Sequence, residues 1–197
     1  RKACSFLDIN FKNSYNIIIE HKYFLERRRL SLLFTISPCT AQGDTVFLIY
    51  DEKGEVRYRV TKSKKPTGAV LLLTDRQGET AAKIKQRLFL PIIRYGISPS
   101  EGKNLSVTLR VSANGIPQQL VLGGVTWRFR GDLVLRNFDL IDVDSSVLLS
   151  HQKCWKDRMD CFTVEIHQPA FEVSLLSVCL CVDFMTEGDI SAVVAIN

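Results

Sequence analysis

The chain lacks a long apolar run. None of its uncharged apolar stretches reaches the roughly 20 residues that a membrane-spanning helix needs, and Arg1-Lys2-Ala3-Cys4 does not lead into the apolar core of a signal peptide. The 197 residues are 46% hydrophobic and 24% charged, which is the composition of a globular protein with one core. This composition excludes disorder, collagen and coiled coil. It predicts a single domain over residues 1–197, with residues 1–15 as a peripheral N-terminal extension.

Cysteine is also scarce. The six cysteines form no paired C-x-x-C knuckles, and two of them lie in the most apolar stretch of the chain. They are Cys4, Cys39, Cys154, Cys161, Cys179 and Cys181. A chain of this size does not need disulfides for stability, so we expect six free thiols, buried at Cys179 and Cys181, and a reducing cytoplasm as the location.

Catalytic motifs are missing as well. H-E-x-x-H, G-x-S-x-G, the P-loop and G-x-G-x-x-G do not occur, and the three histidines are scattered. Asp142-x-Asp144 lacks the glycine and the closing glutamate of a calcium loop. The sequence therefore predicts a protein that is not an enzyme and that uses no metal or other cofactor.

Strand and turn signals dominate what is present. Residues 44–50 and 55–61 flank the turn Asp51-Glu52-Lys53-Gly54, and the second arm alternates polar with apolar residues. This pattern indicates a β-hairpin. Similar units recur at 69–88 and 133–152, and further short strands are indicated at 105–111, 118–122, 126–130 and 161–166. Successive hairpins of this kind favour an antiparallel barrel or sandwich.

One segment departs from the strand pattern. Residues 170–185 (A-F-E-V-S-L-L-S-V-C-L-C-V-D-F-M) are apolar around nearly the full circumference of a helix, so protein must surround that helix on all sides. We expect strands wrapped around it, with Leu175, Leu176, Val178, Leu180 and Val182 among the most buried residues. The alternative is a buried pair of β-strands, because Val, Cys and Phe also favour strands.

The order of these elements resembles that of the Tubby C-terminal-like superfamily, in particular the LURP-one-related proteins and the phospholipid scramblases. The resemblance covers residues 15 to 195 approximately. It rests on L-I-Y-D-E-K-G-E-V-R-Y-R-V at 48–60, L-L-T-D-R-Q-G-E-T-A-A-K-I at 72–84, W-R-F-R-G-D-L-V-L-R-N-F-D-L-I-D at 127–142, and D-C-F-T-V-E-I leading into the apolar helix. It implies a mainly β fold, a closed antiparallel barrel of about twelve strands around a buried C-terminal helix.

Basic residues follow two of the predicted strands at two-residue spacing. Residues 1–136 hold 23 Lys and Arg against 11 Asp and Glu, while residues 137–197 hold 3 against 10. We expect two basic ladders to lie side by side and to surround a phosphate group with charge-assisted hydrogen bonds. The candidate residues are Arg57, Arg59, Lys62, Lys83, Lys85 and Arg87. The alternative is that these charges only prevent edge pairing of strands, just as Arg27–Arg29 is interpreted as a solvated turn.

Two functions follow. The first, favoured by the resemblance, is a non-enzymatic barrel that binds anionic phospholipid headgroups through its basic face, in the cytoplasm at the periphery of a membrane. The second is a structural or protein-interaction domain with no lipid or small-molecule ligand. The expected partner is thus an anionic membrane surface or a protein. Nucleic acid is not expected, because Tyr58, Trp127 and Phe129 fall on the predicted core face and offer no stacking platform.

Overall fold

The computed structural model describes residues 31–39, 43–65, 68–89, 92–111, 117–133, 135–156 and 159–185. The chain divides into two compact units, residues 1–31 and residues 32–197, and the strands and helices described here all belong to the second. Arg27–Arg29 and the predicted extension 1–15 lie outside the described residues. The single-domain interpretation stays a prediction.

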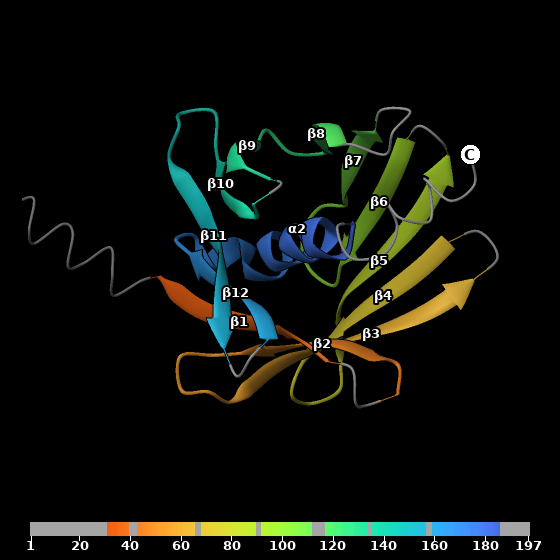
Figure 1. Cartoon of the computed structure of the whole chain (residues 1–197), viewed down its shortest axis with the longest axis vertical. Coiled ribbons are helices and arrows are strands. Elements are labelled where there is room, and N and C mark those ends of the chain that lie inside the picture. The colour runs from red at the N-terminus through yellow and green to blue at the C-terminus, as the bar shows by residue number, and fades with distance from the viewer. Residues whose placement is uncertain are drawn as a thin grey trace, which may run out of the picture. The chain divides into compact units, whose positions relative to one another are not determined.

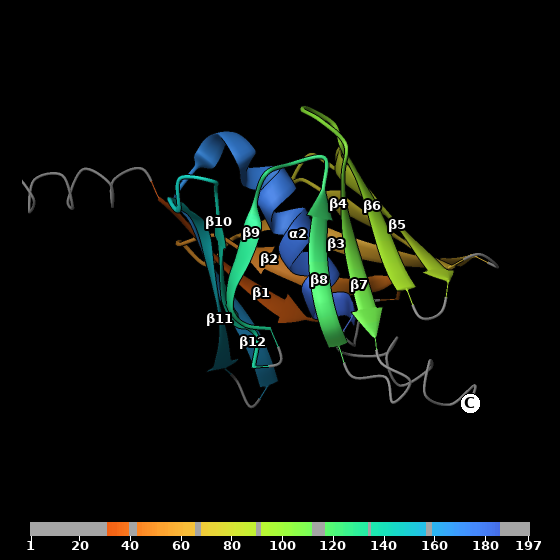
Figure 2. The same ribbon diagram turned by 90° about the horizontal axis from the view of Figure 1, so that it is seen from above.

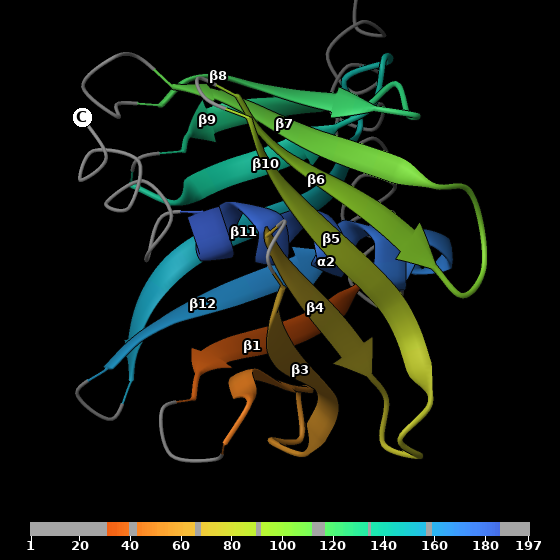
Figure 3. The ribbon, with the colours of Figure 1, turned by 90° about the vertical axis from the view of Figure 1, so that its right-hand side faces the viewer.

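Twelve antiparallel strands form one sheet that curls around a helix (Figures 1 and 3). The strands are β1 (Leu32–Pro38), β2 (Thr45–Tyr50), β3 (Val56–Lys65), β4 (Gly68–Thr74), β5 (Thr80–Phe89), β6 (Ile92–Pro99), β7 (Leu105–Val111), β8 (Pro117–Gly123), β9 (Arg128–Asp132), β10 (Asn137–Ile141), β11 (Val147–Lys156) and β12 (Met159–Ile166). The sheet order is β8-β7-β6-β5-β4-β3-β2-β1-β12-β11-β10-β9. Among the described residues no ladder joins β8 to β9, so the predicted barrel is confirmed but its closure is incomplete.

The apolar segment near the C-terminus is a helix. A 3-10 turn, η1 (Pro169–Phe171), leads into α2 (Glu172–Phe184), and every residue of α2 from Leu175 onward is buried. Figure 2 shows α2 running through the interior of the sheet. The predicted central helix and its buried residues are confirmed, and the alternative of a strand pair is wrong. A helix that is apolar on all sides is stable here because β5, β6 and β11 all contact it.

The connections between strands alternate between two ends of the barrel, because successive strands are antiparallel. The turns β2–β3, β4–β5, β6–β7, β8–β9 and β10–β11 lie at the end where α2 begins, which we call the helix-start rim. The strands of the pairs β1–β2, β3–β4, β5–β6, β7–β8, β9–β10 and β11–β12 come together at the other end, the helix-end rim. Contacts with α2 agree with this assignment: Tyr58 Oη donates to Glu172 at its start, and Lys62 Nζ lies 4.3 Å from the ring centroid of Phe184 near its end.

Aspartate and glycine shape two of the turns at the helix-start rim. Asp51 Oδ1 accepts hydrogen bonds from the amides of Lys53 and Glu55, at 3.0 Å each, and Asp75 Oδ1 accepts two in the same pattern. Gly54 and Gly78 take the left-handed backbone, at φ of 75° and 86°, that these turns need. The predicted hairpins and their turn chemistry are confirmed.

The cysteine prediction is wrong at one pair. Cys154 and Cys161 are directly opposite each other on β11 and β12, with Cα atoms 5.0 Å apart, and they form a disulfide. The pairing of β11 with β12 brings these two cysteines together, and their spacing in the sequence is not that of a C-x-x-C motif. Cys39, Cys179 and Cys181 are free thiols, the last two buried as expected. Because disulfides persist mainly in oxidising compartments, cysteine content no longer favours the cytoplasm.

A buried polar pair fastens the end of α2 to the wall of the barrel. His151, on β11, stacks between the rings of Phe138 and Phe162, with centroids 4.5 and 5.1 Å away. Its Nδ1 lies 2.8 Å from the carbonyl oxygen of Arg136, and its Nε2 lies 3.2 Å from Asp183 Oδ2. A carbonyl oxygen only accepts, so Nδ1 carries a proton. The hydrogen bond between Nε2 and Oδ2 therefore needs one further proton, on one of these two atoms.

Candidate functional site

Charge is segregated by barrel end as well as by sequence half. The helix-start rim carries the acids Asp51, Glu52, Glu55, Asp75, Glu79, Glu101, Asp142, Asp144 and Glu172, against the bases Lys53, Arg57, Arg76, Lys103 and Arg128. The helix-end rim carries the bases Lys62, Arg87, Arg94, Arg110, Arg136 and Lys153, against the acids Asp44, Asp132 and Asp160. The barrel thus presents an acidic end and a basic end among its described residues.

A hollow of about 520 Å³ lies on the outer face of β5, β6, β7 and β8. Its floor is a row of small residues on adjacent strands: Gly96 is opposite both Lys85 and Ser106, and Ser106 is opposite Gly123. A Cβ at Gly123 would lie 2.8 Å from Ser106 Oγ, so glycine is needed there, whereas a Cβ at Gly96 would meet nothing within 4 Å. Three adjacent strands without long side chains leave the sheet bare at this place.

Basic side chains bound the hollow on the side nearer the helix-end rim. Lys85, Arg87 and Arg94 line it, and all three are exposed. Arg87 lies directly opposite Arg94 across the β5–β6 ladder, an arrangement of like charges that destabilises a sheet. Arg94 donates a long hydrogen bond of 3.4 Å to Ser106 Oγ. Within the part of the chain that the structure describes, none of the three forms an ion pair with an acid.

Other arginines of the barrel do have acidic partners. Arg76 pairs with Asp51 and with Glu55, where the second pair measures 2.9 Å, and Arg130 pairs with Asp139 at 2.7 Å. The cluster beside the hollow differs from these two arginines, because among the described residues its three adjacent bases form no ion pair with an acid. Such a place suits an anion that can accept several hydrogen bonds at once.

The predicted site residues fall into three groups. Lys83, Lys85 and Arg87 share the outer face of β5, as expected, while Arg59 is exposed on β3. Lys62 instead faces inward, in the same alternation as Tyr58 and Val60, and its ammonium group lies over Phe184.

Arg57 is held at the other end of the barrel. Its Nε lies 3.6 Å from Glu172 Oε1, and its guanidinium carbon lies 5.5 Å from the ring centroid of Tyr58. The structure therefore brings together only the β5 half of the predicted set.

The expectation that the two basic ladders are adjacent is wrong. β4 pairs with both β3 and β5 and lies between them. Each ladder is on the second arm of its hairpin, so the first arm of the next hairpin separates them. The strand that adds a further basic residue beside the β5 ladder is β6, and that residue is Arg94. The spacing R-L-F-L-P-I-I-R contains a signal for this, because a hairpin register that pairs Phe89 with Ile92 places Arg87 opposite Arg94.

The helix-start rim has a hollow of its own, with the opposite charge. Its volume is about 510 Å³, and its lining includes Asp75, Glu79, Glu101 and Glu172. Tyr58 Oη donates to Glu172 Oε1 at 2.7 Å, and burial together with this hydrogen bond raises the pKa of Tyr58. In the described ranges no group of three or more His, Cys, Asp or Glu side chains is placed to hold a metal ion. No described helix is long and apolar enough to cross a membrane.

Comparisons with known proteins agree with the barrel. A model of the LURP-one-related family matches residues 34–183. The chain is similar to an uncharacterized protein of Bacillus subtilis, YxjI, with 30% identity over 130 residues, which are 66% of this chain and 76% of that protein. It is also similar in fold to a protein from Arabidopsis thaliana solved by X-ray crystallography, with a TM-score of 0.50 and 16% identity. That likeness covers 78% of this chain and 91% of the plant protein.

Proposed function

The chain belongs to the LURP-one-related family, within the Tubby C-terminal-like superfamily, and on that premise we propose that it is a non-catalytic barrel that binds anionic phospholipid headgroups. The binding site is the hollow on β5–β8, and its basic residues are Lys85, Arg87 and Arg94, with Lys83 as the next base along β5. The observation that carries the proposal is the direct opposition of Arg87 and Arg94 beside a bare stretch of sheet.

Electrostatics favours an anionic ligand at this place. The guanidinium groups of Arg87 and Arg94 form no ion pair with an acid in the described part of the chain, so they repel each other, and like charges directly opposite on a sheet cost a few tenths to about 1 kcal/mol. A phosphate bound between them removes this repulsion and accepts hydrogen bonds from both. Each basic side chain near an anionic bilayer contributes about 1 kcal/mol. Lys85, Arg87 and Arg94 together would then strengthen binding by about 3 kcal/mol, a factor of roughly 100.

The proposal gives each residue a distinct part. Arg87 and Arg94 hold the phosphate oxygens from one side, Lys85 adds a mobile positive charge, and Ser106 keeps Arg94 directed across β7. Gly96 and Gly123 leave room for the headgroup. Arg57 and Lys62 take no part, because Glu172 and Phe184 already engage them.

The proposed location is the periphery of an anionic membrane. The cytoplasmic leaflet carries most anionic lipid, and we expect the protein there. The Cys154–Cys161 bond is of a type that persists mainly in oxidising compartments. The number of free thiols at this pair can be counted in protein taken from its own cells under conditions that trap thiols. Two free thiols would place the protein at the cytoplasmic leaflet, and an intact disulfide would place it in an oxidising compartment.

Charge reversal with a matched control tests the proposal. Arg87→Glu/Arg94→Glu should abolish flotation with phosphatidylserine-containing vesicles. Lys53→Glu/Lys103→Glu makes the same change in net charge at the helix-start rim and should bind like the wild type. If both pairs lose binding equally, only net charge matters and the site is not where we place it.

A second variant tests the hollow itself. Gly96→Leu fills the space above the sheet without changing charge, and a Cβ at this position meets no other atom. We expect it to weaken binding while leaving the fold intact by circular dichroism. Unchanged binding would show that the basic face attracts the membrane without receiving a headgroup in the hollow.

A further inference from the structure

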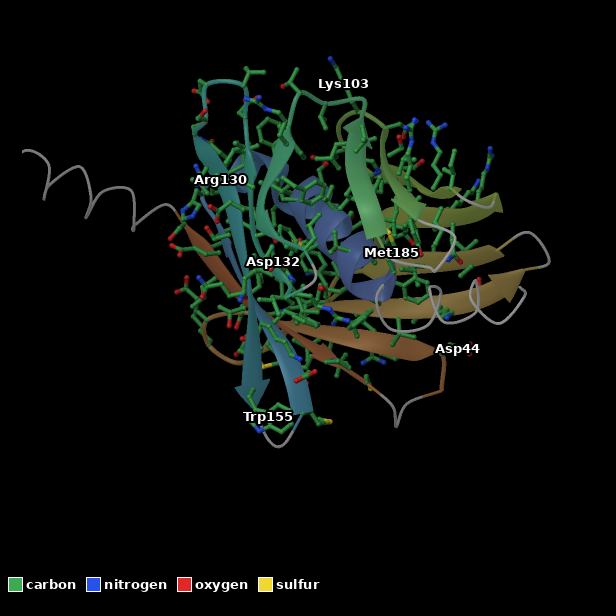
Figure 4. All side chains as sticks on the ribbon, turned by 45° about the horizontal axis from the view of Figure 1, so that its top comes forward. Asp44, Lys103, Arg130, Asp132, Trp155 and Met185 are labelled. Atoms are coloured by element: carbon green, nitrogen blue, oxygen red, sulfur yellow. A yellow bond between two sulfur atoms is a disulfide. The ribbon has the colours of Figure 1, made fainter. Side chains whose placement is uncertain are left out.

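The β11–β12 hairpin projects beyond its neighbours in the sheet. Among the described residues, the ladder with β10 ends at Phe138↔His151 and the ladder with β1 ends at Ile36↔Phe162. The last three pairs of the hairpin, Cys154↔Cys161, Trp155↔Asp160 and Lys156↔Met159, therefore lie beyond both of these described ladders. Figure 4 shows Trp155 at the tip of this hairpin, far from Lys103 of the helix-start rim.

A disulfide and an ion pair link the two arms of the projecting part. An isolated two-stranded ribbon is only marginally stable in water. Here the Cys154–Cys161 disulfide joins the two arms, and Lys153 Nζ pairs with Asp160 Oδ2 at 2.6 Å. These links hold the tip in one conformation, which lowers the entropy cost of using it as a contact surface.

The stapled tip exposes two large apolar side chains. Trp155 is 71% exposed and Met159 is 50% exposed, whereas the chain's other tryptophan, Trp127, is 8% exposed. Tryptophan combines a large apolar ring with a polar N–H, and it is enriched where membranes meet water. Met159 adds a flexible apolar side chain beside it.

The position of the tip connects it with the basic hollow. The end of β11 and the end of β5 lie at the same end of the barrel, the helix-end rim. The described bases of this rim outnumber its acids, and Lys153 itself lies within the hairpin. An anionic bilayer that approaches this rim meets both complementary charge and exposed apolar side chains.

We infer that the hairpin tip, Trp155 with Met159, is an interfacial anchor that inserts among lipid headgroups and fixes the helix-end rim toward the bilayer. The inference rests on the proposed function, and it adds a second contact site and an orientation. The basic hollow supplies long-range attraction that salt screens. The anchor supplies short-range apolar burial, which salt does not screen.

Tryptophan fluorescence of the full chain tests the anchor directly. Addition of vesicles of phosphatidylcholine and phosphatidylserine should shift the emission of the wild type to shorter wavelength, and brominated lipid should quench it. Trp155→Ala should lose this change, since Trp127 is buried, and should bind about tenfold more weakly, as expected for one large apolar side chain withdrawn from water. The matched control is Val143→Ala, which removes a 65% exposed apolar side chain at the helix-start rim and should bind normally.

The possible outcomes separate the two proposals. If vesicles bind the wild type but leave its emission unchanged, the anchor is wrong and the headgroup site stands. If vesicles of either charge fail to bind even at low salt, the headgroup site and the anchor both fail. The emission could instead shift with protein concentration in the absence of lipid, and analytical ultracentrifugation could show a dimer that Trp155→Ala converts to monomer. That result would assign the tip to contact with a second copy of the chain and overturn the anchor.

Discussion

Removal of His151 is the sharpest perturbation of the buried pair that fastens α2. His151→Ala takes away the imidazole that lies between Phe138 and Phe162 and leaves Asp183 buried without its partner on β11. Both side chains of the pair are fully buried, so water does not replace the lost contact. Removal of one partner from a buried pair costs about 3–5 kcal/mol. A typical unfolding free energy is only about 5–15 kcal/mol, so this variant should be severely destabilised.

Asp183→Asn is the matched control. An asparagine amide donates to Nε2 of a neutral imidazole whose Nδ1–H still donates to the carbonyl oxygen of Arg136. The hydrogen bond is therefore kept with a neutral imidazole and a neutral amide, and the loss of unfolding free energy should be on the order of 1 kcal/mol. Asp183→Ala has no such donor and should resemble His151→Ala.

Urea denaturation followed by circular dichroism and tryptophan fluorescence measures these differences. We expect a clear order of midpoints: wild type, then Asp183→Asn, then the two alanine variants well below. The account is contradicted if the unfolding free energy of His151→Ala lies within about 1 kcal/mol of the wild-type value, or if Asp183→Asn is as unstable as Asp183→Ala. In either case the hydrogen bond between His151 and Asp183 is not what holds the end of the helix.

Three further predictions concern the core and the rims. Leu176→Asp should abolish the folded state, because an unpaired charge in the core costs several kcal/mol, whereas Leu176→Met should cost under about 1.5 kcal/mol; the yield and melting of both variants check this. Alkylation without reductant should leave Cys179 and Cys181 unlabelled in mass spectra of the folded protein, since burial, and secondarily the charge of Asp183, raises the pKa of both thiols; rapid labelling would contradict their place inside the barrel. The phenol of Tyr58 ionises near pH 10 in an unfolded chain, and folding raises its pKa. The contact with Glu172 therefore stabilises the fold fully below about pH 10, and this contribution is lost as the pH rises further. In Tyr58→Phe the unfolding free energy should fall less steeply at alkaline pH, and an unchanged slope would contradict the contact.

Much of the fold could be predicted because local signals and burial agree. The turns at Asp51 and Asp75 have the residues that their backbone needs, and α2 has an apolar surface that only an enclosed helix tolerates. β1 and β6 carried no separate signal. β6 follows the apolar run before Pro91 with no polar turn between them, so its start is not marked in the sequence.

The site was harder to predict because it depends on which strands are neighbours. Period-2 spacing identified the β5 ladder, but only the sheet order shows that β6 completes it and that β4 isolates Arg59. The prediction for Lys62 is wrong because the alternation along β3 continues past residue 61 and turns this side chain inward. The Cys154–Cys161 bond likewise arises from strand register, which residue spacing does not encode.

The central claim is that the basic hollow binds an anionic headgroup. Its most direct test is the partition of the wild-type protein between buffer and two kinds of vesicle, phosphatidylcholine alone and phosphatidylcholine with phosphatidylserine, across a salt series. We predict saturable binding to the anionic vesicles that weakens steeply as salt approaches physiological ionic strength, where exposed charges are screened over about 8 Å, and little binding to the neutral ones. Equal binding to both vesicles, or none to the anionic vesicles at low salt, would contradict the account.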